Sequence, residues 1–426
     1  MPLGGVDNVT KNMFVYEFGN DIMLVDCGIG FPDEPGKEAE LFIPDFSYLL
    51  SRSNKIRGLV VTHAHFDHYG AIPYLLEKIN LPIFSSRLTQ EFIKKKIEDM
   101  GMKTNKVDFK LIDGQSNFKL GCFNILPFHI NHSVPEALGL VIKTPVGNIF
   151  HVADYKFDWT PVDERPCDVA RINLLASQQK PRLMLSDCLG AAKAGHTRSE
   201  STIKEVFENL MIRASGLVLV TTVSTNISRI KQAIQASANV GRKVAFLGRS
   251  VEESCQIART LGYFSSLKQF IIPLKKAKSY PLSRLTFIVA GSYGQTDSAL
   301  AKISQNKHHL IKLKKGDVVI FSADPAPPGV LLDVNNTIDN LSRLEARVYY
   351  HEIQDNLHVS GHGTAEDVKM LFHLVKPQMI LPIGGDWRHM YAYSLLAQQM
   401  GYKEEQVLLL KEKQIVEINN QGNIVK

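Results

Sequence analysis

The sequence has few of the features that mark exported or membrane proteins. Its five cysteines are widely scattered and include no CxxC pair, so neither a disulfide framework nor a cysteine zinc site is expected. The N-terminus lacks the basic start and apolar run of a signal peptide, and no stretch approaches the ~18 to 20 apolar residues that a membrane span requires. These absences predict a soluble protein of the reducing cytoplasm, without a membrane partner.

Composition excludes a disordered, fibrous or very small protein. The 426 residues, 44% hydrophobic and 22% charged, are close to ordinary globular usage. At ~150 residues per domain, this length corresponds to two or three domains. The 49 Lys and Arg exceed the 43 Asp and Glu by six. This mild excess is compatible with a polyanionic partner but does not identify nucleic acid.

The spacing of apolar runs predicts two kinds of architecture along the chain. Short β-rich runs separated by turns fill the first third, and an almost unbroken apolar run at 56–62 predicts a strand buried on both faces. From about residue 200, strand and helix patterns alternate, which is typical of a parallel sheet. After Tyr349 the chain returns to short strands, with a helix near 365–375. A second α/β domain is therefore expected within the chain.

The strongest chemical signal follows the buried strand directly. His63, His65, Asp67 and His68 lie within six residues of one another. Imidazole and carboxylate are ligands that suit zinc or another borderline divalent cation. In an extended segment the rings of His63 and His65 point to the same side, because side chains alternate with a period of two. The alternative is a polar, solvated turn, and the density of imidazoles favours the metal site.

A site with two metal ions needs more ligands than one loop can supply. His132 follows a predicted strand at 121–128, and Asp154 follows another at 148–153. A carboxylate in that place could bridge two cations. Taken alone, each residue is more commonly a capping or solvated residue. Their order after the histidine cluster favours the ligand interpretation.

The pattern of Asp26, HAHFDH at 63–68, His132 and Asp154 resembles the metallo-β-lactamase superfamily. Longer motifs over essentially the whole chain resemble the ribonuclease J family in sequence and order. These motifs are PLGG at 2–5, KNM at 11–13, VDCGIGFP at 25–32, IPDFSYL at 43–49, THAHFDHYGAIPYLL at 62–76, NHSVPEALG at 131–139, DYKFDWTPVD at 154–163 and HVSGHGTAEDVKMLFHLVKP at 358–377. The resemblance implies an α/β fold: a metallo-β-lactamase αββα sandwich with an inserted β-CASP α/β domain, divided as 1–198, 199–349 and 350–426.

The resemblance also implies a set of metal ligands. They are His63, His65 and His132 for one ion, Asp67 and His68 for the other, and Asp154 between the two. Asp26 would orient these ligands. Paired cations polarise a phosphate oxygen and lower the pKa of a bridging water, so that hydroxide exists near neutral pH. The implied cofactor is one or two divalent ions, most readily Zn²⁺, with Mn²⁺ or Mg²⁺ as alternatives.

Further residues are implied to act on the phosphate. Asp67, Asp187 and His362 would be catalytic, with His362 facing the scissile phosphate. The residues implied to bind phosphate or RNA are Ser292, Ser322, Ser360, Gly361 and His362, on the loops 291–295, 322–329 and 360–362. A short loop with exposed N–H groups makes an anion-binding nest. Basic residues such as Arg229, Arg242 and those of 268–280 could track a phosphate backbone, although most are expected to be solvated surface charges.

The chain departs from the family pattern at several positions. Gly384 stands where the family has a metal-binding histidine, so the second ion would recruit water, Asp386 or His389, or bind weakly. Ser228 stands where a histidine is common. With the sequence ending at Lys426, we expect the separate C-terminal domain that many family members use in assembly to be missing, so the resemblance does not decide whether the protein forms a homo-oligomer.

Three functions remain as hypotheses. The first is a metal-dependent ribonuclease, a hydrolase that cleaves phosphodiester bonds of single-stranded RNA endonucleolytically, and 5′ to 3′ exonucleolytically if a pocket holds a 5′-monophosphate. The second is a catalytically weakened RNA-binding or scaffold subunit that retains a metal. The third is a lactamase-fold hydrolase of a small ester or thioester. The predicted inserted domain disfavours this third hypothesis, because a small substrate does not need a second domain to enclose it.

Overall fold

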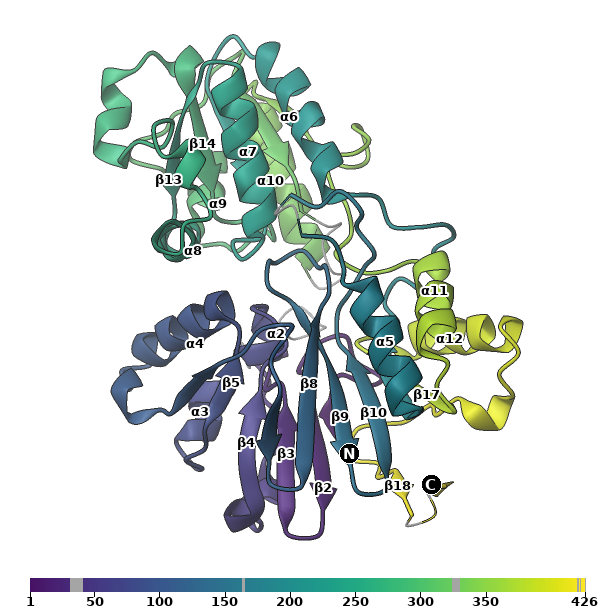
Figure 1. Ribbon diagram of the computed structural model, residues 1–426. Coiled ribbons are helices and arrows are strands. Elements are labelled where there is room, and N and C mark those ends of the chain that lie inside the picture. Colours follow the sequence, from purple (N-terminus) through teal and green to yellow (C-terminus); the bar gives the residue numbers. More distant parts are fainter. Residues whose placement is uncertain (31–40, 163–164, 324–329, 420, 422, 426) are drawn as a thin grey trace.

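The structure, a computed structural model, describes residues 1–30, 41–162, 165–323, 330–419, 421 and 423–425. Two six-stranded sheets pack face to face, and a five-stranded sheet lies beyond one end of them (Figure 1). The first sheet has the order β1 (Pro2–Gly4), β2 (Met13–Phe18), β3 (Asp21–Val25), β4 (Ile56–Val60), β5 (Ile83–Ser85), β6 (Phe109–Leu111). The second has the order β17 (Met379–Ile383), β11 (Pro181–Asp187), β10 (Gly147–Val152), β9 (Leu138–Thr144), β8 (Phe123–His129), β7 (Phe118–Leu120).

Apolar side chains on both faces of each sheet make this a four-layer sandwich. Val60 and Leu140 lie in the core between the two sheets, whereas Leu59 and Phe150 face the helices outside. This follows from the alternation of side chains along a strand. The helices of the first sheet are α1 (Ser47–Leu50), α2 (Phe66–Tyr69), α3 (Ile72–Leu76) and α4 (Arg87–Asp99), and those of the second are α5 (Val169–Gln179), α11 (Ala365–Val375) and α12 (Trp387–Gln399). The predicted αββα sandwich is confirmed.

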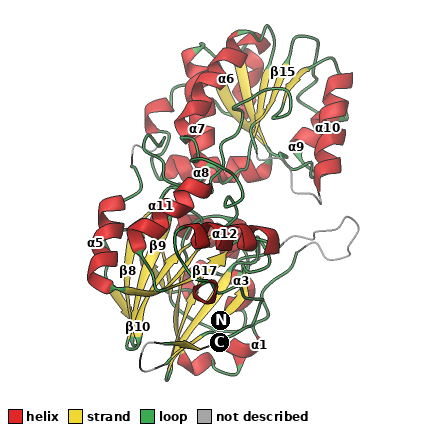
Figure 2. Cartoon of the chain, turned by 90° about the vertical axis from the view of Figure 1, so that its right-hand side faces the viewer, coloured by secondary structure: helices red, strands yellow, loops and turns green. Residues whose placement is uncertain are grey.

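The third sheet is entirely parallel. Its order is β13 (Lys243–Leu247), β14 (Leu285–Val289), β12 (Val218–Thr221), β15 (Val318–Phe321), β16 (Arg347–Tyr349). One face carries α6 (Ile203–Ile212), α7 (Ile227–Asn239) and α8 (Arg249–Thr260), and the other carries α9 (Ala299–Ser304) and α10 (Leu331–Arg343) (Figure 2). The alternating strand and helix patterns predicted this inserted α/β sheet correctly.

The region after Tyr349 differs from the prediction. Its described part is mainly helical, and only β17 joins the sandwich there, while β18 (Glu417–Ile418) and β19 (Ile424–Val425) form a small antiparallel pair. The helix α12 was not predicted, because exposed aromatic residues such as Trp387 and Tyr391 hide its apolar period. The strand β11 was not predicted either, although it lies between β10 and β17.

Buried charges hold the junction between the sandwich and the third sheet. Arg229 on α7 donates from Nε and Nη2 to the carboxylate of Glu200, at 2.9 Å for Nη2, and from Nη1 to the Ser322 carbonyl at 3.0 Å. Lys156 Nζ lies 3.5 Å from Asp158 and 3.9 Å from Glu200. All of these side chains are buried. The expectation of a solvated Arg229 is therefore wrong, because buried oxygen atoms surround its guanidinium group.

Arg242 is a second buried arginine that was expected at the surface. Its guanidinium group donates to the carbonyl oxygens of Gly216, Leu285 and Ala214, at 3.0, 3.0 and 2.7 Å. These carbonyls lie where the strands of the third sheet begin. Arg242 therefore stabilises the inserted sheet from inside and is not available to RNA.

Replacing Arg229 by methionine should lower the free energy of unfolding by about 3–5 kcal/mol, because Glu200 would stay buried without its main counter-charge. Arg249→Met is the matched control. Arg249 also pairs with two carboxylates, but its side chain is 74% exposed, so its loss should leave the free energy of unfolding nearly unchanged. Urea unfolding followed by circular dichroism measures both changes. Equal losses in the two variants would contradict the stabilising role of the buried network.

Candidate metal centre

The carboxyl ends of several strands meet at one edge of the sandwich, next to the third sheet. His63 follows β4, His132 follows β8 and Asp154 follows β10. The ligand atoms of His63, His65, His132 and Asp154 all lie within 4.8 Å of one another, as do those of Asp67, His68 and Asp154. The structure thus brings together the whole set of six side chains that the resemblance implied. Asp154 belongs to both groups.

The first group has the arrangement that a cation needs. The Nε2 atoms of His63 and His132 lie 3.7 and 3.6 Å from Asp154 Oδ2, and His132 Nε2 lies 3.0 Å from His65 Nδ1. His63 Nε2 is buried and has no hydrogen-bond partner among the described residues. Burial lowers the pKa of His65 to about 3 and the pKa of His63 and His132 well below the usual range. The imidazoles are therefore neutral, which is the form that binds metals.

The second group is more strongly charged. His68 Nε2 lies 3.4 Å from Asp154 and 3.6 Å from Asp67. Burial would lower the pKa of His68, but the charges of Asp154, Asp67 and Asp26 together hold it well above its usual range. Burial raises the pKa of Asp67 to about 6. For Asp154, burial acts in the same direction, but the charges of His68, His362 and His132 together outweigh it and hold the pKa well below its usual range.

Hydrogen bonds fix the orientation of the rings. His68 Nδ1 donates to Asp26 Oδ2 at 2.8 Å. The hydroxyl of Thr62 also donates to Asp26 at 2.8 Å and lies 3.1 Å from His63 Nδ1, so it accepts from that ring. Asp26 therefore orients one ring directly and another through Thr62. Partners of this kind set the tautomer of a metal-binding histidine and leave the other nitrogen free for the ion.

Two contacts at the site were not found from the sequence. Asn12 Nδ2 donates to Asp67 Oδ2 at 3.4 Å and lies 3.1 Å from His68 Nε2. His132 Nδ1 donates to the carbonyl of Gly361 at 2.7 Å. The KNM motif at 11–13 was a signal for Asn12, but a contact made by a backbone carbonyl leaves no mark on the residue type. Gly361 belongs to the segment that returns from the third sheet.

The residues expected at the phosphate divide into two sets. His362 Nδ1 donates to Asp187 Oδ2 at 2.7 Å, and the ligand atoms of both lie within 4.8 Å of Asp154. Ser360 accepts from the His362 backbone N–H at 3.1 Å, so it lies beside this pair. Ser292 and Ser322 follow β14 and β15 instead, and both are buried.

The buried position of these two serines corrects their expected role. The hydroxyl of Ser322 donates to the Leu357 carbonyl and accepts from Arg229. An RNA contact by Ser322 would require these bonds to break, and Ser292 would first have to become exposed. The remainder of the expected 322–329 loop, residues 324–329, lies outside the described residues.

Gly384 lies beside the shared carboxylate. It has a φ of +69°, and a Cβ there would lie 3.6 Å from both Asp154 Oδ1 and Asp187 Oδ1. Asp386 and His389, the suggested replacements, are absent from the ligand groups found among the described residues. His389 Nδ1 accepts from the backbone N–H of Asp386 at 3.2 Å and so helps to cap α12.

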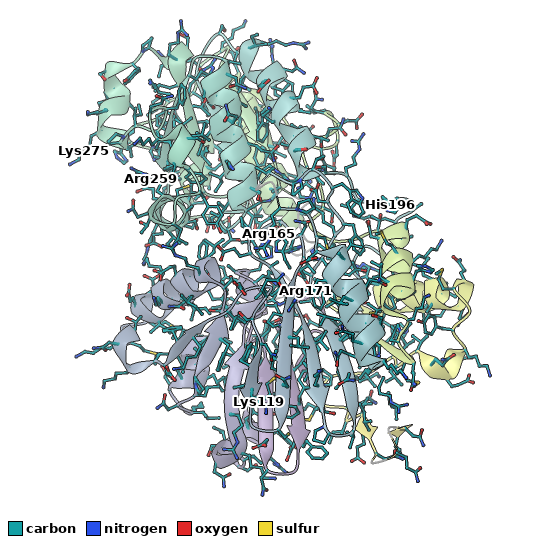
Figure 3. The ribbon with its side chains drawn as sticks, viewed as in Figure 1. Lys119, Arg165, Arg171, His196, Arg259 and Lys275 are labelled. Carbon is teal, nitrogen blue, oxygen red and sulfur yellow. The ribbon has the colours of Figure 1, made fainter. Side chains whose placement is uncertain are left out.

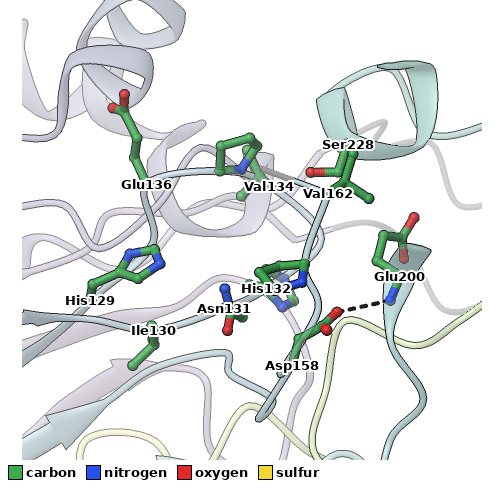
Figure 4. Close-up of a pocket in the computed structure, with 12 residues that line it drawn as sticks. His129, Ile130, Asn131, His132, Val134, Glu136, Asp158, Val162, Glu200 and Ser228 are labelled. Carbon is green, nitrogen blue, oxygen red and sulfur yellow. Dashed lines mark hydrogen bonds between the residues drawn. The ribbon is translucent and has the colours of Figure 1, made fainter. Parts of the chain in front are cut away.

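Ser228, the other departure from the family pattern, lines a small cavity behind His132 (Figure 4). Asp158 and Glu200 lie on the same cavity, and the Glu200 backbone N–H donates to Asp158 at 2.8 Å. Ser228 thus shares a cavity with one of the ligand residues, His132. It offers no imidazole to the site.

Comparisons with known proteins agree with this geometry. Family models described as "Beta-lactamase superfamily domain", "Ribonuclease J, beta-CASP domain" and "Zn-dependent metallo-hydrolase RNA specificity domain" match residues 22–217, 215–341 and 345–408. A Ribonuclease J2 of Bacillus subtilis is 32% identical over 420 residues, which cover 99% of this chain and 75% of that protein. The chain belongs to the ribonuclease J family. Its metallo-β-lactamase sandwich with an inserted β-CASP domain is the fold that the sequence predicted.

Other relatives define how far the match extends. A Ribonuclease J of Helicobacter pylori is 37% identical over 417 residues, 98% of this chain but 60% of that protein. The chain thus spans about three fifths of the length of that relative. A crystal structure of a protein of unknown function from Enterococcus faecalis V583 matches with a TM-score of 0.64 and 13% identity, covering 99% of this chain and 98% of that one. This last likeness shows the fold alone.

Replacing Gly361 by alanine should displace the His132 ring, because a Cβ there would lie 2.6 Å from His132 Cε1 and 2.8 Å from Nδ1. Histidine ¹⁵N NMR of the metal-free protein should show the loss of the hydrogen-bonded Nδ1 proton. Gly195→Ala is the control: its φ of +81° strains an alanine, but no heavy atom of the described residues lies within 4 Å of a Cβ there, so the His132 ring should stay in place. An unchanged His132 signal in Gly361→Ala would show that Gly361 does not set the orientation of this ring.

Proposed function

We propose that the chain is a metal-dependent ribonuclease that hydrolyses phosphodiester bonds of single-stranded RNA. The observation that carries this proposal is the convergence of four imidazoles and the Asp67 carboxylate on Asp154, with a buried His63 Nε2 that has no hydrogen-bond partner among the described residues. Membership of the ribonuclease J family and the match to an RNA specificity domain support RNA as the substrate. Endonucleolytic and 5′ to 3′ exonucleolytic cleavage are the two modes proposed.

The donor set fits divalent cations. We assign the first ion to His63, His65 and His132 and the second to Asp67 and His68, with Asp154 shared. Neutral imidazoles and carboxylates suit Zn²⁺ best, and Mn²⁺ or Mg²⁺ are further candidates. Such ions, when bound, supply Lewis acidity to a phosphate oxygen and make water a stronger acid.

The remaining roles belong to side chains of the chain itself. Asp67 would accept a proton from the attacking water, a role open to a carboxylate that lies beside the shared ligand Asp154. Asp187 accepts from Nδ1 of His362 and so orients the ring that would contact the phosphate. Ser360 and Gly361 would position the same phosphate through polar and backbone groups.

A weakened subunit that binds RNA and retains one metal is the second candidate function. Gly384 and Ser228 favour it, because each removes an imidazole from the neighbourhood of the site. Among the described residues, no other imidazole joins the second ligand group. The first group is complete, so this candidate still includes metal binding.

The boundaries and surroundings of the protein are part of the proposal. We propose domain boundaries at 198/199 and 349/350; the last strand of the sandwich before the insertion ends at Asp187, and β16 ends at Tyr349. Among the residues that the structure describes, none of the helices has the length and apolar character needed to cross a membrane. A location in the cytoplasm and a homo-oligomeric state are further proposals.

Asp67→Ala should reduce cleavage of a fluorescent single-stranded RNA by at least about 100-fold, because general-base catalysis alone contributes about that much. Asp108→Ala is the matched control, since that carboxylate is exposed and, within the described part of the chain, pairs only with Lys110. Metal content of each purified protein is measured beside the rate. Equal cleavage by the natural protein and Asp67→Ala would remove the enzyme assignment and leave the scaffold function.

Gly384→His should tighten binding of the second divalent ion by at least about tenfold, by adding an imidazole between Asp154 and Asp187. Gly384→Ala carries the same left-handed backbone strain without the ring, and therefore isolates the effect of the imidazole. Calorimetric titration of metal-free protein with Zn²⁺ gives the affinity and stoichiometry. If the histidine variant binds no more tightly than the alanine variant, Gly384 is not the position of a missing ligand.

A further inference from the structure

Basic residues are concentrated in one part of the third-sheet domain. Residues 255–316 contain 11 Lys and Arg but a single acid, Asp297, for a net charge of +10. The other 364 residues carry 38 Lys and Arg against 42 Asp and Glu, a net charge of −4. The mild positive charge of the whole chain therefore hides a strongly basic segment.

The fold places most of these charges at one edge. In a parallel sheet, the segments that precede the strands lie together at the edge where the strands begin. Residues 261–284 precede β14 and residues 305–317 precede β15, and these strands flank β12 in register. We call their exposed cations the basic edge, which consists of Lys268, Lys275, Lys276, Lys278, Arg284, Lys307, Lys312, Lys314 and Lys315.

Contacts tie this edge to the sheet without neutralising it. Arg284 Nη1 donates to the Gly241 carbonyl at 3.2 Å. Asp317, the nearest acid in sequence, is buried and accepts from the backbone N–H groups of Leu217 and Lys314, both at 2.7 Å. In the described part of the chain, no carboxylate pairs with a member of the basic edge. The cations therefore stay free for an external anion.

The basic edge is remote from the candidate metal centre. The carboxyl ends of the same strands lead to the junction, where Ser322 contacts Leu357 and Arg229. Strands of four to five residues separate the two edges by about 13–17 Å at ~3.3 Å per residue. Figure 3 shows Lys275 on the outer side of the upper domain, whereas Arg165 lies at the junction.

We propose that the basic edge binds the phosphate backbone of RNA outside the catalytic cleft, so that a long RNA is held at two places. This inference rests on the proposed RNA substrate. Exposed lysines are mobile point charges, which suits sequence-independent contacts with phosphates. A membrane surface is disfavoured, because amphipathic membrane-binding segments expose large apolar residues, and in the described 255–316 segment only Leu282 is an exposed large hydrophobic residue.

The test neutralises four lysines of the basic edge in one variant, Lys275→Gln, Lys276→Gln, Lys314→Gln and Lys315→Gln. The matched control neutralises four lysines of the sandwich, Lys106→Gln, Lys110→Gln, Lys119→Gln and Lys411→Gln. Filter binding in EDTA gives the dissociation constant for a long RNA at several salt concentrations. Cleavage of a six-nucleotide RNA with added metal gives the activity of the cleft alone.

The edge variant should bind the long RNA at least about tenfold more weakly, and its log–log salt slope should fall by about 3, since each lost phosphate contact removes 0.7–0.9. Cleavage of the short RNA should stay within about twofold of the natural protein, because the cleft is untouched. Equal binding of long RNA by the edge and control variants would overturn the inference. Loss of binding to phosphatidylglycerol vesicles with unchanged RNA binding would overturn it as well.

The outcome separates the two proposals. If the natural protein binds long RNA through the basic edge but cleaves no RNA with metal, the ribonuclease proposal is wrong and RNA binding at the basic edge is supported. If short RNA is cleaved and the edge variant binds long RNA normally, RNA binding at the basic edge is contradicted and the ribonuclease proposal is supported.

Discussion

The candidate metal centre depends on one buried carboxylate, Asp154, which lies between two sets of ligands. Its Oδ2 lies within 3.7 Å of nitrogen atoms of His63, His68 and His132. Burying an unsatisfied polar group costs about 1–3 kcal/mol, and His63 Nε2 is such a group among the described residues. A fold tolerates this cost where a ligand offsets it. The same burial keeps the imidazoles of the first group neutral and ready for a cation.

The architecture delivers these groups from distant parts of the sequence. The carboxyl ends of strands from both sheets of the sandwich meet at one edge. The segment that returns from the β-CASP domain adds Gly361 and His362 from the opposite side. The insertion is therefore tied to the ligands and is not a separate module. The Arg229 and Glu200 pair fixes the same junction from inside. Orientation of the His362 ring and anchoring of the inserted sheet thus share one region.

The structural features that the sequence predicted are those that depend on local patterns of residues. The apolar run at 56–62 and the adjacent histidines needed no tertiary information, and the alternation after residue 200 predicted a parallel sheet. His132 and Asp154 were suggested by their positions after predicted strands, whereas Asp187 required the family resemblance, because an isolated residue carries no spacing. Arg229 and Ser322 were misplaced, since residue type alone does not show whether a polar group is buried among carbonyls. The Gly361 carbonyl contact was not predictable, because any residue has a carbonyl.

We propose that Asp154 joins two cation sites. The Asp154→Asn variant is the sharpest test of this role. Asparagine keeps the shape of the side chain but removes the charge that faces His63, His68 and His132. Metal content by mass spectrometry and cleavage of single-stranded RNA are measured on the same preparation, with circular dichroism as a check on folding. We expect the Asp154→Asn protein to fold and to lose both its bound divalent metal and its RNA cleavage. A folded Asp154→Asn protein with natural metal content and natural cleavage would contradict this role.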